Sequence, residues 1–519
     1  MISIASTYFN RRPQFLNTLK SLQNSVVKDF EMIVVDDCSD EEHRIDDLPA
    51  QFPFLKVFRI EKQNKTYKNP CIPFNLAFSK CSGDKIVIQN SECLHVDDIL
   101  DFVDKNINDS DYFVFGVYSL DERLSKAIVD VSNLRNSINF IACGAITNGQ
   151  NGWYNHGIHR PHALHFCSAI SRKNLKELNG FDERYAEGSC FDDNEFLHRI
   201  RVKGLNVKFI DDKVALHQFH KNFNYEVKGI HLLEARNEHL YRNGTLKENC
   251  FVAKNEKPIF PIKIIGFTQL RNELSKGNLE NWFRQMSVCD KIYIFDQNSN
   301  DGSIEFYKKQ KNVIVIESPV NRFKEELICK GELLSLVQQN EKDADWILWL
   351  DGDLLLDGRL LKNDGAHLKD LCWAATRLDA DALFFNHFNL WRSDVYYRTD
   401  DNYHSLNGNW CPLWKNGRDI YFPKSIGLHQ RQYPEGLKKG LRTNFSVVHR
   451  GFATDYQIIT KYDTYKQNGQ NGWDLERLLN ENGLTVELVD KELIPEWFQI
   501  QDSESPLNKK KIIDVYAGK

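Results

Sequence analysis

Two apolar segments of the sequence end in polar motifs that could bind a cation. KIVIQNSE runs into Asn90 and Glu92, and WILWLDGDLLL places Asp351 and Asp353 one residue apart. Carboxylate oxygens are the ligands that hard divalent ions such as Mg2+ and Mn2+ prefer. A polar turn that only ends a strand is the structural alternative for each motif. We interpret the aspartate pair as a metal site and NSE as a variant of one, because glutamate keeps the charge and asparagine keeps an acceptor.

Acids and histidines elsewhere in the chain could complete these sites. Asp192 and Asp193 precede apolar residues at helical spacing, where an acid could be a general base or could only cap the helix. VALHQFH offers His217 and His220 as metal ligands, and His217 is favoured because the apolar run ends there. RTNFSVVHRGF ends an apolar run at His449, which could also be an ordinary core or surface histidine.

The same series of strand ends occurs twice along the chain. The distance from the start of ISIASTYFNR to Asp36 is 34 residues, and the distance from the start of IKIIGFTQLRNE to Asp296 is also 34. The next motif follows 54 residues later at Asn90 in the first series, and 55 residues later at Asp351 in the second. Matched spacing over three strand ends indicates two copies of one domain.

Helical periodicity separates these strand ends. Pro13 suits a first helical turn, and Phe15, Leu19 and Leu22 then fall on one face. Strand, helix and strand in this order predict parallel strands with right-handed crossovers, and ligands bind outside the carboxyl ends of such strands. The sequence therefore predicts an α/β fold of two tandem Rossmann-like domains with mostly parallel central sheets. No G-x-G-x-x-G motif follows the first strand of either copy, so a dinucleotide site is not expected.

A change in composition predicts the boundary between the copies. Residues 223–243 have a helical pattern, and LKENCFVAKNEKPIFP (246–261) is polar and ends in proline. We expect an N-terminal domain over 1–245, a linker over 246–261 and a C-terminal domain over 262–519.

Composition excludes several classes of protein. The chain has 519 residues, of which 41% are hydrophobic and 27% charged, with a net charge of −5. These values are typical of a globular protein and disfavour a general nucleic-acid binder. The twelve cysteines form no CxxC pair, which argues against a zinc knuckle and favours free thiols in a reducing compartment. With no apolar stretch of transmembrane length and no secretory signal pattern, we expect a cytoplasmic protein.

The ordered motifs resemble those of nucleotide-sugar-dependent glycosyltransferases of the GT-A fold. VVDDCSD, followed by a strand ending in a DxD-like triplet, is similar to their donor site, and NGFDERYAEGSCFDDNEFLHRI resembles their NGFDE…EDxxLxxR block. Over nearly all of 1–220 the first copy resembles inverting, family-2-like enzymes, including the galactosyltransferase-like branch. The second copy resembles them over about 262–360, and more loosely onward to His449.

This resemblance implies a role for each candidate residue. In the first copy, Asp193 would be the general base, with Asp192 beside it. The residues implied to contact the nucleotide sugar are Asp36, Asp37, Asn90, Asp296 and Asp351. The implied ligands of Mn2+ or Mg2+ are Glu92, His217, Asp351, Asp353 and His449. A divalent ion held there would neutralise the charge that develops on the departing diphosphate.

Two segments do not follow the family pattern. NHGIHRPHALHF spaces four histidines three residues apart, which suits an acceptor-contacting loop or a plain exposed loop better than a zinc site. The second copy has no GFDE…DD block; its later half is aromatic and carries acids at Asp394, Asp400 and Asp401. Aromatic rings with carboxylates suit sugar binding and equally suit a core with a charged rim. Asp394 is the hypothesis for the base of this copy.

We therefore predict a bifunctional, metal-dependent glycosyltransferase with two hexosyltransferase activities in glycan biosynthesis. Its expected donors are nucleotide sugars, with UDP-sugars foremost, and its acceptor would be a glycan or another hydroxyl compound. The alternative is one active domain joined to a degenerate sugar-binding domain. A nucleotidyltransferase is disfavoured because TYFNRR and FTQLRNE lack the glycines of a phosphate-binding loop.

Overall fold

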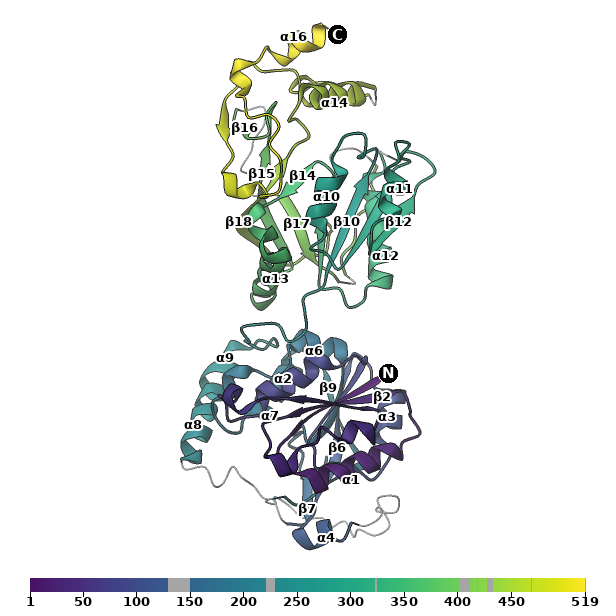
Figure 1. Cartoon of the computed structure of the whole chain (residues 1–519), viewed down its shortest axis with the longest axis vertical. Helices are drawn as coiled ribbons and strands as arrows, with labels where there is room; N and C mark the ends of the chain where they lie inside the picture. Colours follow the sequence, from purple (N-terminus) through teal and green to yellow (C-terminus); the bar gives the residue numbers. More distant parts are fainter. Residues whose placement is uncertain are drawn as a thin grey trace. The chain divides into compact units, whose positions relative to one another are not determined.

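The computed structural model divides the chain into two compact units, Met1–Pro261 and Ile262–Lys519 (Figure 1). The structure describes residues 1–128, 150–220, 229–322, 324–400, 410–417, 419–426, 433–467 and 469–518. We refer to the two units as the first unit and the second unit.

The first unit is built on a sheet whose strands run in the order β3-β2-β1-β4-β8-β6-β9-β5, with β7 paired to β6. Strands β3, β2, β1 and β4 are parallel, whereas β8 is antiparallel to β4 and β6. Its elements are β1 Ile2–Tyr8, α1 Arg12–Gln23, β2 Phe30–Asp36, β3 Leu55–Arg59, α2 Cys71–Lys80, β4 Lys85–Gln89, β5 Cys93–His95, α3 Ile99–Asn106, β6 Asp111–Ser119, α4 Glu122–Lys126, β7 Gly152–Asn155, β8 Cys167–Ser171, α6 Arg172–Leu178, α7 Asp192–Val202, β9 Asn206–His217, α8 Ile230–Leu240 and α9 Leu246–Glu248.

The second unit repeats this strand order, and the described part of its sheet has no counterpart of β7. Its sheet runs β12-β11-β10-β13-β17-β15-β18-β14, and each neighbouring pair has the same sense as its counterpart in the first unit. Its elements are β10 Ile264–Leu270, α10 Leu279–Met286, β11 Lys291–Asp296, α11 Ser303–Lys308, β12 Val313–Glu317, α12 Glu326–Asn340, β13 Trp346–Trp349, β14 Leu354–Leu356, α13 Lys362–Arg377, β15 Ala382–Asn389, β16 Tyr396–Arg398, β17 Trp410–Lys415, β18 Gly440–His449, α14 Asp455–Gln467, α15 Trp473–Glu476, β19 Val486–Leu488 and α16 Ile512–Ala517. The predicted fold class, two tandem Rossmann-like α/β domains, is confirmed.

Helices cover both faces of the first sheet because its strands are apolar on both sides (Figure 1). On one face α1 and α3 pack through Phe15, Leu19 and Val103, and on the other α2 and α7 pack through Phe74 and Ile200. Burying each of these side chains stabilises the fold by about 1.5–3 kcal/mol. Such a sandwich leaves the strand ends as the exposed edges at which polar groups can gather.

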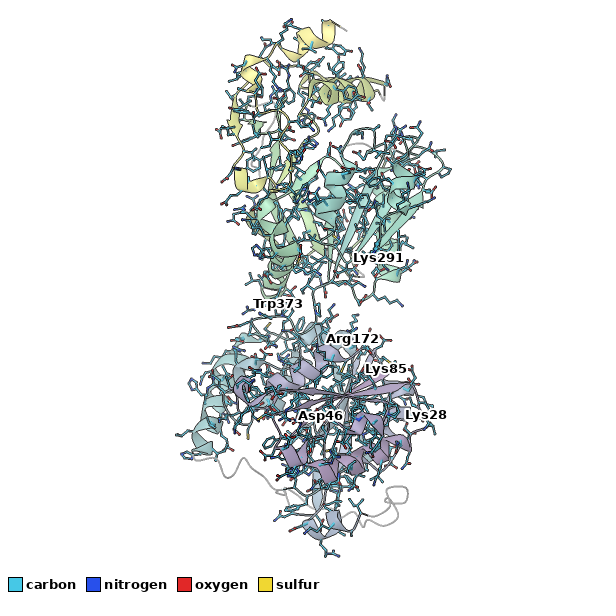
Figure 2. The ribbon with its side chains drawn as sticks, viewed as in Figure 1. Lys28, Asp46, Lys85, Arg172, Lys291 and Trp373 are labelled. Carbon is cyan, nitrogen blue, oxygen red and sulfur yellow. The ribbon has the colours of Figure 1, made fainter. Side chains whose placement is uncertain are left out.

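Lysines at the amino ends of two parallel strands form ion pairs with acids of neighbouring segments. Lys85 begins β4 and lies 2.6 Å from Asp104, and Lys291 begins β11 and lies 2.5 Å from Glu341 (both lysines are labelled in Figure 2). The candidate functional residues instead follow the carboxyl ends of these strands.

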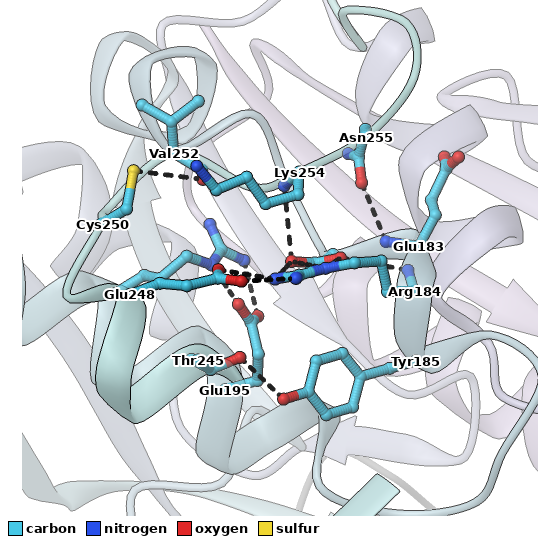
Figure 3. Close-up of polar contacts among 12 residues, drawn as sticks. Glu183, Arg184, Tyr185, Glu195, Thr245, Glu248, Cys250, Val252, Lys254 and Asn255 are labelled. Carbon is cyan, nitrogen blue, oxygen red and sulfur yellow. Dashed lines mark hydrogen bonds and ion pairs between the residues drawn. The ribbon is translucent and has the colours of Figure 1, made fainter. Parts of the chain in front are cut away.

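Residues 246–261, predicted as a linker, pack within the first unit. Arg184 pairs with Glu248 at 2.9 Å, and Glu183 N donates to Asn255 Oδ1 at 2.8 Å (Figure 3). Ile259 and Phe260 belong to the core of this unit. The polar side chains that suggested a free connector instead bond to the loop that precedes α7.

The helix predicted over 223–243 is described from Ile230 onward. Helix α8 starts at Ile230 and continues through a π-turn into α9, while residues 221–228 lie outside the described part of the chain. Every described cysteine is a free thiol, as predicted. The helices in the described part of the chain are all too short or too polar to span a lipid bilayer.

We expect the buried His95 to make the first unit sensitive to acid. It is 6% exposed, its Nε2 lies 2.9 Å from Gln89 Oε1, and burial lowers the pKa of His95 from 6.5 to about 4. Because the unfolded chain takes up this proton first, its contribution to stability is complete above about pH 6.5 and is lost as the pH falls toward 4. His95→Gln should remove roughly 3 kcal/mol of that loss, measured by urea unfolding between pH 7 and 4. His231→Gln, an exposed histidine on α8, is the control; equal pH dependence in wild type and His95→Gln would refute the assignment.

Candidate active sites

Two carboxylates at the end of β2 are already paired with cations of the first unit. Asp36 is buried and accepts from Arg59 Nη1 at 2.6 Å. Asp37 accepts from Lys65 Nζ at 2.7 Å and from Tyr67 Oη at 2.5 Å. These pairs hold both acids at the carboxyl ends of the parallel strands. The nucleoside contact predicted for the two acids stays a prediction.

Glu92, at the end of the NSE motif, lies in a cluster with two histidines. Its Oε1 is 3.2 Å from His217 Nε2 and 3.5 Å from His220 Nε2, and one potential ligand atom from each residue lies within 4.8 Å of the others. Arg11 Nη1 donates to the other oxygen, Oε2, at 2.7 Å. Asn90, the other polar residue of the motif, donates weakly to Oε1 at 3.4 Å.

Strand pairing explains how residues so far apart in sequence meet. Immediately after Glu92 the chain forms β5, in which Cys93 lies opposite His217 of β9. Gln218 N then donates to the Glu92 carbonyl at 3.2 Å. His217 at the end of β9 and His220 just after it therefore lie beside Glu92, which follows β4.

The charge states in this cluster suit a divalent ion. Burial would raise the pKa of Glu92, but Arg11 and the two histidines hold it well below its usual value. Burial lowers the pKa of His217, more than the neighbouring carboxylate raises it. An ionised carboxylate beside a neutral imidazole is the protonation state that binds metal. These residues fit Mn2+, which accepts both oxygen and imidazole nitrogen ligands.

The acid pair at the start of α7 does not cap that helix. The N-cap residue is Phe191, in a left-handed conformation with φ 64° and with no capping side-chain bond. Asp192 Oδ1 accepts from Asn69 Nδ2 at 2.8 Å. Asp193 Oδ1 accepts from the backbone N of His165 at 2.8 Å and pairs with His165 Nδ1. Both acids are thus held by neighbours from other parts of the chain.

The buried His165 and the partly exposed Asp193 each favour the charged form of the other. Burial would lower the pKa of His165, but the charge of Asp193 and the hydrogen bond to it raise it. Burial would raise the pKa of Asp193, but His165 lowers it. Burial and the negative charge of Asp193 raise the pKa of Asp192. The two neighbouring carboxylates therefore differ in proton affinity.

Sequence reasoning did not identify His165 as part of this site. It lies in the run of regularly spaced histidines, which predicted only a loop, and another member, His156, lies near Asp211 at 3.5 Å instead. The spacing of the histidines gave no signal for which one meets the acid pair, because that depends on the packing of α7 against the segment before β8.

A single residue joins the two clusters of the first unit. Phe166 follows His165, its carbonyl accepts from Asn90 N at 3.0 Å, and its ring lies 5.6 Å from that of His217. The Glu92 cluster and the Asp193–His165 pair therefore stand at one edge of one sheet.

The second unit places its counterpart residues at the same edge, with a different partner. Asp353 Oδ2 lies 3.2 Å from His449 Nε2 and 3.1 Å from Lys461 Nζ. Burial would raise the pKa of Asp353, but Lys461 and His449 hold it well below its usual value. Burial raises the pKa of Asp351 to about 7, so this acid is largely protonated below neutral pH. Among the described residues, the three-ligand clusters with ligand atoms within 4.8 Å of one another both lie in the first unit.

Two further candidates of the second unit accept hydrogen bonds from other residues of that unit. Asp296 is buried and accepts from Ser299 N at 2.7 Å and from Ser299 Oγ at 2.6 Å. Asp394 accepts from Gln501 N at 2.9 Å, from Asp502 N at 3.1 Å and from Arg450 Nη2 at 3.1 Å. These contacts anchor the C-terminal segment, and the role of Asp394 as a base stays a prediction.

The structure describes one of the two remaining acids of this segment. Asp400 pairs with Arg398 at 2.7 Å. Asp401 lies outside the described residues.

A known protein family matches part of the first unit. Residues 3–178 match the family model described as glycosyl transferase family 2. This stretch contains Asp36, Asp37, Glu92 and His165, but ends before the acid pair of α7. No curated protein sequence matches the chain.

Similar solved structures are distant in sequence. S. aureus TarS 1–349 in complex with UDP-GlcNAc is 19% identical, with 43% of this chain and 59% of that chain covered and a TM-score of 0.32. The mannosyltransferase PcManGT from Pyrobaculum calidifontis, in complex with GDP-Man and Mn2+, is 17% identical, with 48% and 62% covered and a TM-score of 0.29. The chain thus spans less than two thirds of the length of these structures. Over residues 3–178, the family match confirms the resemblance to family-2 glycosyltransferases.

Proposed function

We propose that the chain is a bifunctional glycosyltransferase in which each unit transfers a sugar from a nucleotide-sugar donor to a hydroxyl of a glycan or other acceptor. The observation that carries this proposal is the Glu92–His217–His220 cluster beside the Asp193–His165 pair at one edge of the first sheet. The family match over 3–178 supports the same activity for this unit.

In the first unit, the donor diphosphate needs positive charge beside it, whereas the acceptor hydroxyl needs a base that takes its proton. Glu92, His217 and His220 would hold Mn2+ or Mg2+, which supplies positive charge to the departing nucleoside diphosphate. Arg11, which contacts Glu92, adds a second positive group at the same place. Asp36 and Asp37 would contact the nucleoside.

Asp193 is the base in this proposal, and His165 positions it. His165 occupies Asp193 Oδ1, and among the described residues no group bonds Oδ2, which leaves that oxygen to take the proton of the acceptor hydroxyl. The acceptor oxygen forms a bond to the anomeric carbon as the bond from that carbon to the diphosphate breaks, so the configuration inverts. The positive imidazole keeps Asp193 ionised and ready before the acceptor binds.

One observation favours the alternative of a degenerate second domain. Asp351, Asp353 and His449 do not form a three-ligand cluster like that of the first unit. A purely sugar-binding second unit would bind a donor without consuming it, whereas a transferase would release the nucleotide.

The metal site of the first unit is tested by Mn2+ binding to the full chain. Glu92→Ala should weaken Mn2+ binding roughly 100-fold or more, because it removes the anionic ligand, and Glu92→Asp should weaken it less. Binding is measured by electron paramagnetic resonance of free Mn2+. Glu177→Ala, an exposed acid on α6, is the matched control. Wild-type affinity in Glu92→Ala would contradict the site.

A further inference from the structure

The two units differ at the position three residues after a histidine that both of them have, His217 in the first unit and His449 in the second. His217 lies opposite Cys93, three residues after Asn90, and His449 lies opposite Leu354, three residues after Asp351. His217 and His449 are therefore equivalent. The third potential ligand of the first unit, His220, stands three residues after His217, and the equivalent position of the second unit is Phe452. A phenyl ring offers no ligand for a metal ion.

A lysine ammonium stands in the second unit beside the remaining pair. Lys461, on α14, places Nζ 3.1 Å from Asp353 Oδ2 and 3.3 Å from His449 Nε2, which are themselves 3.2 Å apart. Asn389 Oδ1 lies 2.8 Å from His449 Nδ1. If His449 donates its Nδ1 proton to Asn389, then Nε2 is an acceptor, and Lys461 donates to both the carboxylate and the imidazole.

The surroundings are shaped to hold this ammonium. Lys461 Nζ lies over the Phe452 ring, 4.5 Å from its centroid, and that ring contacts His449 edge-on at 4.9 Å. At Gly451, an added Cβ would lie 2.0 Å from Lys461 Nζ and 2.5 Å from Asp353 Oδ2. Glycine at this position, Phe452 and Lys461 thus form one built site for a positive charge.

We infer that Lys461 occupies the cation position of the second unit, which therefore binds and uses its donor without a divalent ion. This inference rests on the proposed transferase function of that unit. The Asp353–His449 pair does not fit a metal while the ammonium lies against both of its ligand atoms. Its positive charge, fixed by the protein, would face the donor diphosphate in place of Mn2+ or Mg2+.

Mn2+ alone is the probe that tests the inference, on the full chain carrying Glu92→Ala to remove the site of the first unit. This background should bind no Mn2+ at a position that Asp353→Ala abolishes. Adding Lys461→Ala frees the carboxylate and the imidazole, and should create one Mn2+ site per chain that Asp353→Ala abolishes. Adding Lys461→Arg, which keeps a positive charge, should create none. Lys466→Ala, an exposed lysine on the same helix, should also create none.

Each result has one meaning for the inference. A Mn2+ site in the Glu92→Ala background that Asp353→Ala removes would overturn it, and so would Lys461→Ala that melts like wild type but gains no site. Should Lys461→Ala melt early, Lys461→Gln replaces it with the same expectation. Residual Mn2+ binding that Asp353→Ala leaves unchanged would count against the metal site proposed for the first unit, not against Lys461.

Discussion

Asp193→Asn is expected to lower the rate of sugar transfer by the first unit about 10²–10⁴-fold while leaving donor binding within about twofold of wild type, because removing a general base costs rates of this size. Asparagine has nearly the same shape and still accepts from the backbone N of His165. It cannot accept a proton from the acceptor hydroxyl. The measurement is kcat for transfer together with the Kd of the donor in the full chain.

Two comparisons separate catalysis from structure in this experiment. Glu187→Gln, an exposed acid in the loop before α7, should leave both quantities unchanged. If Asp193→Asn instead lowered donor affinity as much as it lowered kcat, Asp193 would be a residue that orders α7 and not a base.

The strand framework was predictable from sequence because each parallel strand is an apolar run that stops at a polar residue. The matched spacing of Asp36 with Asp296 and of Asn90 with Asp351 located equivalent strands in two sheets of the same topology. Buried strands leave this signature in the sequence. The strands that complete each sheet after β4 and β13 carry no such regular spacing, since loops of different length separate them.

The composition of the sites was less predictable because it depends on packing between distant segments. The sequence favoured His217 over His220 as a metal ligand, yet both imidazoles lie within 3.5 Å of Glu92 Oε1. Lys461 stands 108 residues after Asp353 and on a helix without a sequence motif, so nothing in the sequence connects the two. His165 is 28 residues from Asp193, and only the fold brings them together.

Glu92→Ala and Asp353→Ala are expected to act on different units. Each should lower transfer by its own unit roughly 100-fold or more and leave the other unit at its wild-type rate, because each removes an acid on which one cation position depends. In the first unit that cation would be the divalent ion. In the second unit Asp353 holds the ammonium of Lys461 in place.

The release of nucleotide from a panel of nucleotide sugars shows whether one chain holds two independent nucleotide-sugar sites. The full-length wild type, Glu92→Ala and Asp353→Ala are compared with Mn2+ and with a chelator. We expect one donor whose consumption needs Mn2+ and is lost in Glu92→Ala, and another whose consumption survives the chelator and is lost in Asp353→Ala. A single donor activity that Glu92→Ala abolishes and Asp353→Ala leaves untouched would refute two independent sites and leave the second unit as a binding domain.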